Sequence, residues 1–476
     1  MTTTASFELD SSLIPEEWEL ATIGSFGEII SGNAFKSKQF VKAGVPVVKI
    51  SNVQCGHYIK KNQEYLPESY MRDHKRFVVN QGDLLMALTR PITNNELKIC
   101  RYPFSELGLL NQRVAKISTE GSVSENYIHL FFLSRDFKLQ VQSKLTETLQ
   151  PNLSPKDLAR LYTAFPPLAE QKVIADKLDS LLAQVETTKA RLDRVPDILK
   201  RFRQSVLAAA VSGRLTDKDG DFTSIHVEDT WSHDVEGRKH WKSFKFSEVV
   251  KVIGGSQPPK SEFRHEAAAS YIRLIQIRDY KSDKHIVYIP LDKAKRFVSK
   301  DDVMIGRYGP PIFQILRGLE GAYNVALMKA EPNPDLIDKE YLYWYLQNYK
   351  LYSYIEAASD RTAGQSGVNK KHLESYPILL PPLDEQTEIV RRVEELFAFA
   401  DAVEQKAQAA TERVNKLTQS ILAKAFCGEL TADWRAANPD LISGENSAEA
   451  LLEKIKAERE ALKPKKKTRA KKVKKT

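Results

Sequence analysis

Apolar residues recur at intervals of three and four in two long segments, residues 166–216 and 381–431. This spacing places the apolar side chains along one side of a helix. Sustained over many turns, it is typical of long helices that pack against each other. Each segment holds about 40 helical residues, or ~60 Å of helix at 1.5 Å per residue. The seam positions that we expect to be buried are Leu178, Leu181, Leu199, Phe202, Leu396, Leu417 and Ile421.

The two segments are copies of each other at an offset of 215 residues. Pro166-Pro167-Leu168 with Glu170-Gln171 recurs as Pro381-Pro382-Leu383 with Glu385-Gln386, and Gly213-x-Leu215-Thr216 recurs as Gly428-x-Leu430-Thr431. Sixteen of 51 positions are identical, nearly all at the two ends. The Pro-Pro pairs and the glycines mark where each helix begins and ends. Pro196, which has no counterpart in the second copy, should kink the first helix, because proline removes a backbone hydrogen bond.

The regions before the two helices share a plan but not their side chains. Strand-like Val47–Ile50 resembles Tyr271–Leu274, Gly82–Met86 resembles Asp301–Ile305, and aromatic helices follow at Tyr127–Leu133 and Tyr341–Gln347. Gln150–Leu153 matches Gln365–Val368 at the same offset. We therefore predict two mixed α/β (α+β) domains in tandem, each followed by a long helix. The predicted segments are a first globular domain (1–165), helix 1 (166–216), a linker (217–240), a second globular domain (241–380), helix 2 (381–431), an extension (432–463) and a basic tail (464–476).

Charge adds a candidate partner to this plan. The net charge of +9 equals the charge of the tail alone, because residues 463–476 hold nine basic and no acidic residues. Within the otherwise neutral body, residues 30–116 carry +8 and residues 251–330 carry +6. Two separate basic regions suggest two contacts with a polyanion. Two ordinary solvated surfaces are the alternative. The lysine run of the tail cannot build a core, and we expect it to be disordered.

Composition restricts the cellular location that we expect for the protein. No apolar run approaches the roughly 20 residues that cross a bilayer, and residues 1–10 lack the pattern of a signal peptide. The three cysteines, Cys55, Cys100 and Cys427, stand far apart, without zinc or disulfide spacing. We expect a cytoplasmic protein without a membrane contact.

The polar side chains of both basic regions suit the reading of DNA. Arginine can make bidentate contacts to guanine, Asn and Gln to adenine, and lysine mostly neutralises phosphate. In the first region the candidates are Asn33, Lys36, Lys38, Asn52, Gln54, Arg90, Asn94, Asn95, Gln112 and Arg113. In the second region they are Gln257, Lys260, Arg264, Arg273, Gln276, Arg278, Arg307 and Arg361. Because the two sets differ, the target should consist of two different half-sites.

Two other functions fit the sequence less well. None of the four Pro-Pro pairs has the Asp/Asn-Pro-Pro-aromatic pattern of an amino-methyltransferase of DNA, and Gly254–Ser261 imitates a phosphate loop only with two prolines inside it. The nine histidines show no metal-ligand spacing. A coiled-coil scaffold that never touches DNA explains the helices but not the two basic globular domains.

The duplicated Pro-Pro-Leu-x-Glu-Gln and Ser-x-Leu-Ala-x-Ala-x-x-Gly-x-Leu-Thr motifs, with two dissimilar domains before them, resemble the specificity subunits of type I restriction–modification systems. The resemblance covers essentially the whole chain. Residues 165–216, including Leu199–Arg203, look most like the enteric group that marks adenine.

The resemblance implies one copy of this chain per complex and no active site or metal of its own. It implies that two target recognition domains each read one half of a bipartite target on double-stranded DNA. The two long helices would pair as an antiparallel coiled coil, set the gap and dock two methylation subunits. Two motor–nuclease subunits would complete the complex. S-adenosylmethionine, ATP and magnesium would be used by these partners. The segment 448–462 resembles a C-terminal extension with one more helix. Base-contact residues vary with the target within the family, so none is carried over.

Overall fold

The computed structural model describes residues 14–461 except 120, 122, 147, 218, 230, 363 and 364, and it describes only the backbone of residues 360–366 that lie in strands. The chain forms two compact units. Unit 1 comprises Met1–Arg191 and Ala410–Thr476, and unit 2 comprises Leu192–Ala409. Each unit therefore contains one recognition domain together with parts of both repeated helical segments.

Unit 1 has two four-stranded sheets, in the orders β4-β3-β10-β5 and β2-β11-β6-β9. Strands β3 and β10 are parallel, and the other pairings are antiparallel. The strands are β1 (Glu19–Thr22), β2 (Glu28–Ser31), β3 (Val45–Val48), β4 (Tyr65–Leu66), β5 (Val78–Val79), β6 (Leu84–Ala87), β7 (Ile92–Thr93), β8 (Glu96–Leu97), β9 (Ile99–Arg101), β10 (Gly108–Leu110), β11 (Val114–Ser118) and β12 (Tyr162–Phe165). The helices are α1 (Ile23–Phe26), α2 (Tyr70–Asp73), α3 (Glu125–Phe132), α4 (Arg135–Ser143), α5 (Pro155–Ala159) and α6 (Leu168–Leu192), with α13 (Ala432–Ala437) and α14 (Ala448–Ala461) from the end of the chain.

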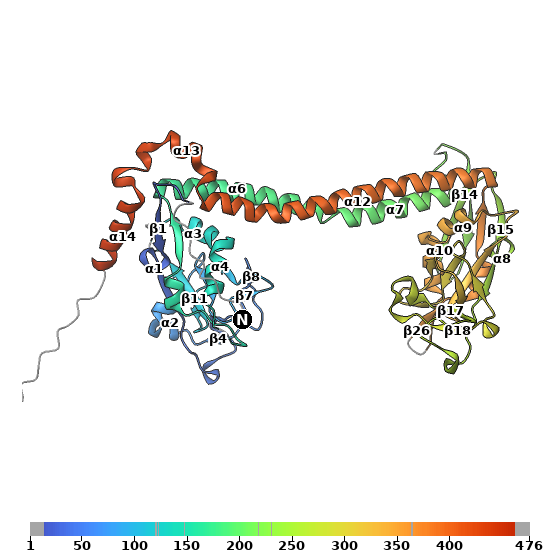
Figure 1. Cartoon of the computed structure of the whole chain (residues 1–476), viewed down its shortest axis with the longest axis horizontal. Helices are drawn as coiled ribbons and strands as arrows, with labels where there is room; N and C mark the ends of the chain where they lie inside the picture. Colours follow the sequence, from blue (N-terminus) through green and yellow to red (C-terminus); the bar gives the residue numbers. More distant parts are fainter. Residues whose placement is uncertain are drawn as a thin grey trace, which may run out of the picture. The chain divides into compact units, whose positions relative to one another are not determined.

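Strand β6 shows how the core of unit 1 is built. All four of its residues are buried, so it reads as a continuous apolar run. Successive side chains point to opposite faces of a sheet. Leu84 and Met86 join the large cluster formed with α3, α4 and α6, whereas Leu85 joins a smaller cluster on the other face. Helices α3 and α4 lie between α6 and the distal strand β4 (Figure 1).

Unit 2 repeats this plan, with sheets β16-β24-β20-β22 and β18-β17-β23-β19 and a parallel β17–β23 pair. Its strands are β13 (Phe222–Val227), β14 (His233–Arg238), β15 (Lys242–Lys245), β16 (Val250–Gly254), β17 (Tyr271–Ile275), β18 (Tyr288–Pro290), β19 (Phe297–Val298), β20 (Val303–Gly306), β21 (Tyr308–Gly309), β22 (Gln314–Leu316), β23 (Gly321–Tyr323), β24 (Leu327–Pro332), β25 (Asp360–Thr362), β26 (Gln365–Gly367) and β27 (Pro377–Leu380). Its helices are α7 (Val195–Val211), α8 (Phe246–Val249), α9 (Lys339–Tyr345), α10 (Tyr349–Ala357) and α11 (Lys370–Ser375). The strands and aromatic helices that were predicted as repeats occupy corresponding places, so the mixed α/β class is confirmed.

The two repeated helical segments differ in continuity. The second is one helix, α12 (Leu383–Phe426), of 44 residues. The first is broken between α6 and α7, and Pro196 lies in the first turn of α7. Proline is tolerated there because the first-turn N–H groups have no partner within the helix. The expected disturbance of the first helix at Pro196 is therefore present as a two-residue interruption, at Asp193 and Arg194.

Within each unit the helix segments run antiparallel. In unit 2 the Arg203 guanidinium donates to Asp401 (2.7 Å) and Glu404 (2.8 Å), whereas Arg392, earlier in α12, donates to the carbonyl of Leu215 (2.8 Å), later in the chain. In unit 1 the Lys177 ammonium contacts the carbonyl of Leu430 (3.2 Å). The antiparallel pairing that the resemblance implied is thus present in both units.

The seam prediction holds except at one position. Leu178 and Leu199 are buried, and Leu181, Phe202, Leu396 and Ile421 are half-buried. Leu417, however, is 46% exposed, and the assignment of this residue to the seam is wrong. Between Val414 and Ile421 the helix turns Thr418, not Leu417, inward. Leu417 and Thr418 both complete a three-four spacing between Val414 and Ile421. The prediction took Leu417 because it is the more apolar residue, and this choice was wrong.

The repeated motifs at the helix ends form an internal clip in each unit. In unit 1 the carboxylate of Glu170, which is fully buried, accepts hydrogen bonds from the Trp18 indole (2.7 Å), the Thr431 hydroxyl (2.7 Å) and the Arg435 guanidinium (2.6 Å). In unit 2 the carboxylate of Glu385 accepts hydrogen bonds from the Trp241 indole (3.0 Å) and the Thr216 hydroxyl (3.2 Å), and His240 lies 2.9 Å away. The start of one repeated segment is thus joined to the end of the other.

The glutamine beside each of these glutamates fixes the neighbouring recognition domain. The side-chain oxygen of Gln171 accepts from the backbone N–H of Ser124 (3.0 Å), the residue that caps α3. Gln386 accepts in the same way from Asp338 (2.7 Å), which caps α9. The similarity of the helix ends therefore has a structural cause within the chain.

The expected linker and extension both have regular structure. Residues 217–240 contain the antiparallel hairpin β13–β14. In the extension, α14 confirms the expected additional helix, and it packs Ala448 and Ile455 into the core of unit 1. The tail 464–476 lies outside the described residues. Among those that are described, no helix combines the length and the apolar character needed to span a membrane.

His129 on α3 should make the stability of unit 1 depend on pH. Burial, assisted by the nearby Arg101, lowers the pKa of His129 from 6.5 to about 4. The unfolded chain therefore binds a proton at a higher pH than the folded chain. We expect the free energy of unfolding to fall as the pH drops from about 6.5 towards 4, by up to about 1.4 kcal/mol per pH unit from this residue. Urea titrations of the wild type and of His129→Gln at several pH values measure the difference. Parallel pH profiles would rule this out.

Candidate nucleic-acid interface

Four backbone hydrogen bonds at one end of the β2-β11-β6-β9 sheet recur at the corresponding end of the β16-β24-β20-β22 sheet in unit 2. We call this set of hydrogen bonds the backbone frame. The N–H of Gly32 donates to the carbonyl of Val114 (3.2 Å), and the N–H of Gly255 donates to the carbonyl of Leu327 (2.9 Å). In unit 1 the other three bonds run from the N–H groups of Asn33, Asn111 and Leu88 to the carbonyls of Leu110, Val48 and Arg113. In unit 2 the corresponding bonds run from the N–H groups of Ser256, Asn324 and Arg307 to the carbonyls of Tyr323, Ile275 and Ala326. Two domains with little sequence in common thus build the same set of loops.

Glycine is required at the centre of this frame because backbone passes directly beside it. A Cβ atom on Gly32 would lie 2.0 Å from the carbonyl oxygen of Leu110. A Cβ on Gly255 would lie 1.9 Å from the carbonyl oxygen of Asn324. Both distances are far below van der Waals contact, so only glycine allows this approach.

In both units a short segment, which we call the strap, makes one more backbone hydrogen bond to this frame. The N–H of Leu153 donates to the carbonyl of Leu88 (2.8 Å), and the N–H of Val368 donates to the carbonyl of Arg307 (2.9 Å). These straps are the Gln150–Leu153 and Gln365–Val368 repeats of the sequence. Their similarity is explained by this shared backbone contact.

In unit 1 the frame brings four candidates to neighbouring loops. Asn33 follows β2, Gln112 and Arg113 precede β11, and Arg90 follows β6 beside the strap, where its N–H donates to Pro151 (2.7 Å). Gln112, Arg113 and Arg90 are exposed, and Asn33 is half-exposed. Their amide and guanidinium groups are available for hydrogen bonds to base edges or phosphates.

The remaining candidates of unit 1 that are exposed lie on two protruding loops. Asn94 and Asn95 form the two-residue turn of the β7–β8 hairpin, both with positive φ (50° and 63°). This backbone conformation favours asparagine in a tight hairpin. Lys36 and Lys38 lie at the 3-10 turn Ser37–Gln39 and are exposed.

Asn52 is a correction to the predicted set. It is fully buried, its side-chain oxygen accepts from the backbone of Lys49 (2.9 Å), and its nitrogen donates to the carbonyl of Ile59 (2.9 Å). Asp279 has the same role in unit 2, accepting from the backbone of Gln276 (3.0 Å), and burial raises its pKa. These residues hold a turn and are not free to reach DNA. Gln54 is partly engaged as well, since its amide donates to Ser51 (2.8 Å).

In unit 2 the exposed candidates surround the corresponding frame. Gln257 lies beside Asn324, and Arg307 directly follows β20, with its guanidinium 5.2 Å from the Tyr308 ring centroid. Lys260 is exposed on a 3-10 turn, and Arg264 stacks on Tyr271 at 4.7 Å.

A basic cavity of about 360 Å³ opens beside this frame. It is lined by Ile277, Arg278, Lys281, Tyr308, Gly309, Pro310 and Gln314. Arg278 was predicted, whereas Lys281 and Gln314 were missed. The i, i+3 spacing of Arg278 and Lys281 around one turn was a usable signal for the lysine. Gln314 reaches the cavity through the pairing of β22 with β20, which no local pattern of the sequence predicts.

Two other candidates of unit 2 are less available than predicted, and the prediction for a third, Arg361, is not tested. Arg273 is held by Asp283 (3.0 Å), and its Nε is buried. The side-chain nitrogen of Gln276 is buried, so in this conformation it cannot donate to a base. Arg361 lies in β25, and its side chain is outside the described part of the structure. Exposed apolar residues were also missed: Leu149 beside the strap of unit 1 and Val325 in the frame of unit 2 can contact thymine methyl groups.

No group of three or more His, Cys, Asp or Glu residues is placed to hold a metal ion in the ranges that the structure covers. The candidate interface consists of amide, guanidinium and ammonium donors on loops held by strands. Such an arrangement suits recognition of a polyanion that also displays hydrogen-bonding edges.

Comparison with known proteins agrees with this interpretation. Residues 15–197 and 238–413 match the family model described as type I restriction modification DNA specificity domain. The specificity subunit of the Escherichia coli type I restriction enzyme EcoBI is 38% identical over 96% of both chains. That of EcoKI from E. coli K12 is 32% identical over 97% of this chain and 100% of its own.

Solved structures show the same fold. The HsdS subunit of Thermoanaerobacter tengcongensis matches with a TM-score of 0.57 at 20% identity, covering 87% of this chain and 98% of that chain. A chain from a type I R-M system complex matches with a TM-score of 0.61 at 19% identity, with the same coverage. With two family matches that cover both recognition domains, and relatives aligned over nearly the whole length, this chain belongs to the type I restriction modification DNA specificity family.

Proposed function

We propose that this chain is the DNA-recognition subunit of a type I restriction–modification complex, in which each unit reads one half of an asymmetric bipartite target. The single observation that carries the proposal is the backbone frame at the sheet end of both units, around Gly32 and Gly255. The frame is shared, and the side chains that it presents differ. This arrangement is expected of two domains that bind the DNA backbone in the same way and recognise different bases.

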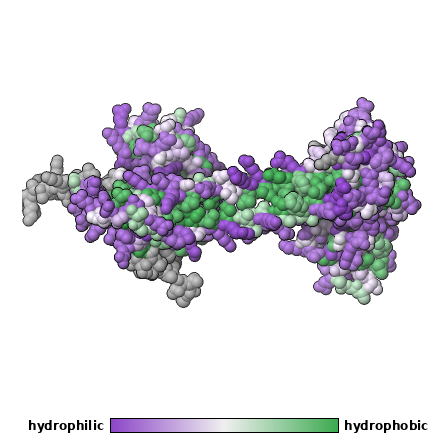
Figure 2. All heavy atoms as spheres, turned by 90° about the horizontal axis from the view of Figure 1, so that it is seen from above, coloured by the Kyte–Doolittle hydropathy of each residue, from purple (hydrophilic) through white to green (hydrophobic). Residues whose placement is uncertain are grey.

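The antiparallel helices are proposed to set the gap between the half-sites and to dock two methylation subunits. Figure 2 shows apolar side chains over the helices of each unit, whereas the domains around them are mostly hydrophilic. Ile198, Leu383, Phe399 and Leu417 are large apolar residues of these helices that are exposed. Exposed apolar patches rimmed by polar residues are typical of protein–protein contacts.

We further propose that the chain has no active site of its own and acts in the cytoplasm. Methylation of adenine, with S-adenosylmethionine, and cleavage, with ATP and magnesium, are assigned to the methylation and motor–nuclease partners. One copy of this chain with two copies of each partner is the proposed composition. The alternative of a scaffold without DNA contact gains no support from the relatives.

The test is single-molecule sequencing of methylated DNA from a host that expresses this chain with its methylation subunit. We expect an asymmetric, bipartite adenine-methylation motif that disappears when this chain is deleted. Replacing residues 1–165 by the corresponding domain of a relative should change one half of the motif only. A motif that persists without the chain would refute the proposal, and a change in both halves would refute the one-unit, one-half-site assignment.

A further inference from the structure

A cavity in unit 2 lies where unit 1 buries one of its own aromatic rings. The repeat offset of 215 places Val211, the last residue of α7, opposite Phe426, the last residue of α12. The cap contacts of Gln171 and Gln386 align Phe131 on α3 with Tyr345 on α9. The two neighbourhoods can therefore be compared residue by residue.

In unit 1 the Phe426 side chain fills this place. Its ring lies edge-on at 5.4 Å from the ring of Tyr127 and 5.2 Å from the ring of Phe131. Phe426 is buried in the main cluster of the unit. Edge-to-face aromatic contacts of this kind stabilise beyond the area that they bury.

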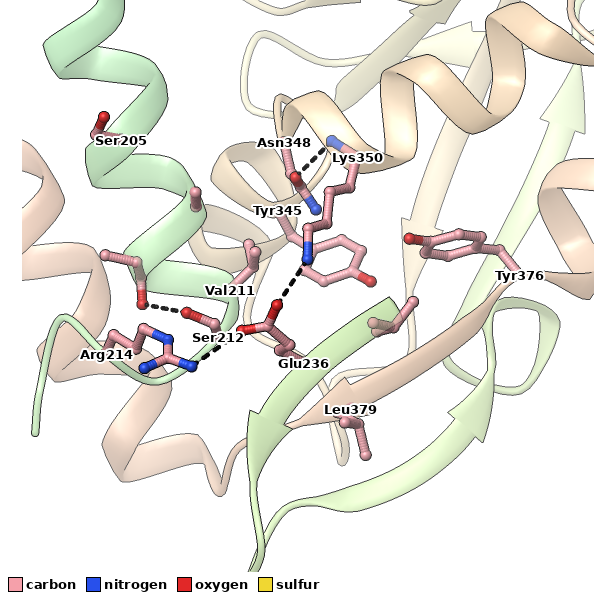
Figure 3. Close-up of a pocket in the computed structure, with 13 residues that line it drawn as sticks. Ser205, Val211, Ser212, Arg214, Glu236, Tyr345, Asn348, Lys350, Tyr376 and Leu379 are labelled. Atoms are coloured by element: carbon pink, nitrogen blue, oxygen red, sulfur yellow. Dashed lines mark hydrogen bonds and ion pairs between the residues drawn. The ribbon is translucent and has the colours of Figure 1, made fainter. Parts of the chain in front are cut away.

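In unit 2 the same place holds Val211, which has no ring, and a cavity of about 330 Å³ adjoins it (Figure 3). The cavity is lined by Ser205, Ala208, Ala209, Val211, Ser212, Arg214, Val235, Glu236, Tyr345, Asn348, Lys350, Tyr376 and Leu379. The alanines, Val211 and Tyr345, the counterpart of Phe131, make its interior largely apolar. The hairpin β13–β14, which contributes Val235 and Glu236, supplies one wall.

The rim of the cavity is charged. Glu236 is paired with Lys350 (3.0 Å) and with Arg214 (3.1 Å), as Figure 3 shows, and these hydrogen bonds lower the pKa of the carboxyl group. Two cations face one carboxylate, so the rim has an excess of one positive charge. An apolar interior behind a positive rim fits an aromatic side chain with a carboxylate next to it.

We infer that this cavity accepts an aromatic side chain, flanked by an acidic residue, from a methylation subunit. The inference rests on the proposed function, which places that partner on these helices. The chain itself shows which group fits, because unit 1 fills the corresponding place with Phe426. Aromatic side chains in desolvated pockets dominate the binding energy of many interfaces. It follows that the two methylation subunits dock differently, since the Phe426 ring already occupies this position in unit 1.

The test is Val211→Phe in the full-length chain, which inserts the ring that unit 1 carries. The purified methylation subunit of the same system is titrated, and native mass spectrometry counts the copies bound. We expect the wild type to bind two copies. The variant should bind one copy normally and the other at least tenfold more weakly, with an unchanged affinity for target DNA. Ser247→Phe, which adds the same ring at an exposed position on α8, is the matched control and should bind as the wild type does.

Three outcomes overturn the inference. If Val211→Phe binds both copies with wild-type affinity, the cavity is not a docking site, while the proposed function stands. If the wild type forms dimers without a partner and the variant does not, the occupant is a second copy of this chain. If the wild type binds no methylation subunit, the proposed function fails with it. Should Val211→Phe unfold, Ser205→Phe at the exposed mouth of the cavity replaces it, with the same expected loss.

Discussion

Gly255→Ala should weaken specific DNA binding at least 100-fold, although it adds only one methyl group. The new Cβ would lie 1.9 Å from the carbonyl oxygen of Asn324, a backbone atom that is itself held in the frame. Relief of the clash must break the bonds from Gly255 to Leu327 or from Ser256 to Tyr323. Either change displaces the loops that carry Gln257 and Arg307. A 100-fold loss corresponds to about 2.7 kcal/mol, the order of one or two lost base contacts.

The adjacent residue provides the matched control. A Cβ on Gly254 meets no atom within 4 Å, so Gly254→Ala should bind DNA as the wild type does. Titration of a labelled target duplex at a fixed salt concentration measures both variants, because phosphate contacts make the affinity depend on salt. Equal binding by the two variants would show that the frame does not position the reading loops. Gly32→Ala in unit 1 should have the corresponding effect, with duplexes altered in one half-site showing which half each variant no longer reads.

Glu170→Ala should lower the stability of unit 1 by about 3–5 kcal/mol, the usual cost of removing one partner of a buried ion pair. The substitution leaves the Trp18 indole and the Thr431 hydroxyl without their acceptor, and it removes the closest counter-charge of Arg435. Because this clip joins the first recognition domain to both helix segments, its loss should loosen all three together. Hydrogen exchange followed by mass spectrometry, which separates the peptides of the two units, measures the change.

The corresponding glutamate of unit 2, Glu385, provides the comparison. Glu385 is 19% exposed and its partner His240 is 54% exposed, so solvent screens this clip, and Glu385→Ala should cost less. The double variant Glu170→Met with Arg435→Met should recover most of the loss, because a buried pair can be replaced by apolar groups at little cost. An equal loss in the two units, or no recovery in the double variant, would contradict this account of the clip.

The clips also change the interpretation of the repeat. The resemblance implied that the two helices dock partners, yet Glu170, Gln171 and Gln386 at the similar helix ends are fully buried and bonded within the chain. The features that we propose for partner contacts are the exposed apolar residues along the helices and the cavity beside Val211. These features differ between the two units, so the repeat of the sequence does not make the two proposed partner sites alike.

The sequence by itself determined the architecture. The three-four spacing, the offset of 215 and the Pro-Pro and glycine boundaries located both helical segments, because periodicity and backbone restrictions are local properties of a chain. The strands around Val47 and Tyr271 followed from their apolar runs. The basic regions and the motifs identified the class of partner and the family.

Only the tertiary structure decided which polar and apolar side chains are available. Asn52 and Arg90 look equally suitable in the sequence, but one closes a turn in the interior and the other is exposed beside a strap. Leu417 and Thr418 are neighbours, and the more polar one faces inward. The clip of Glu170 with Thr431 joins residues 261 positions apart. Burial and long-range pairing depend on how distant segments pack, and a local pattern holds no information about the partner that a side chain meets.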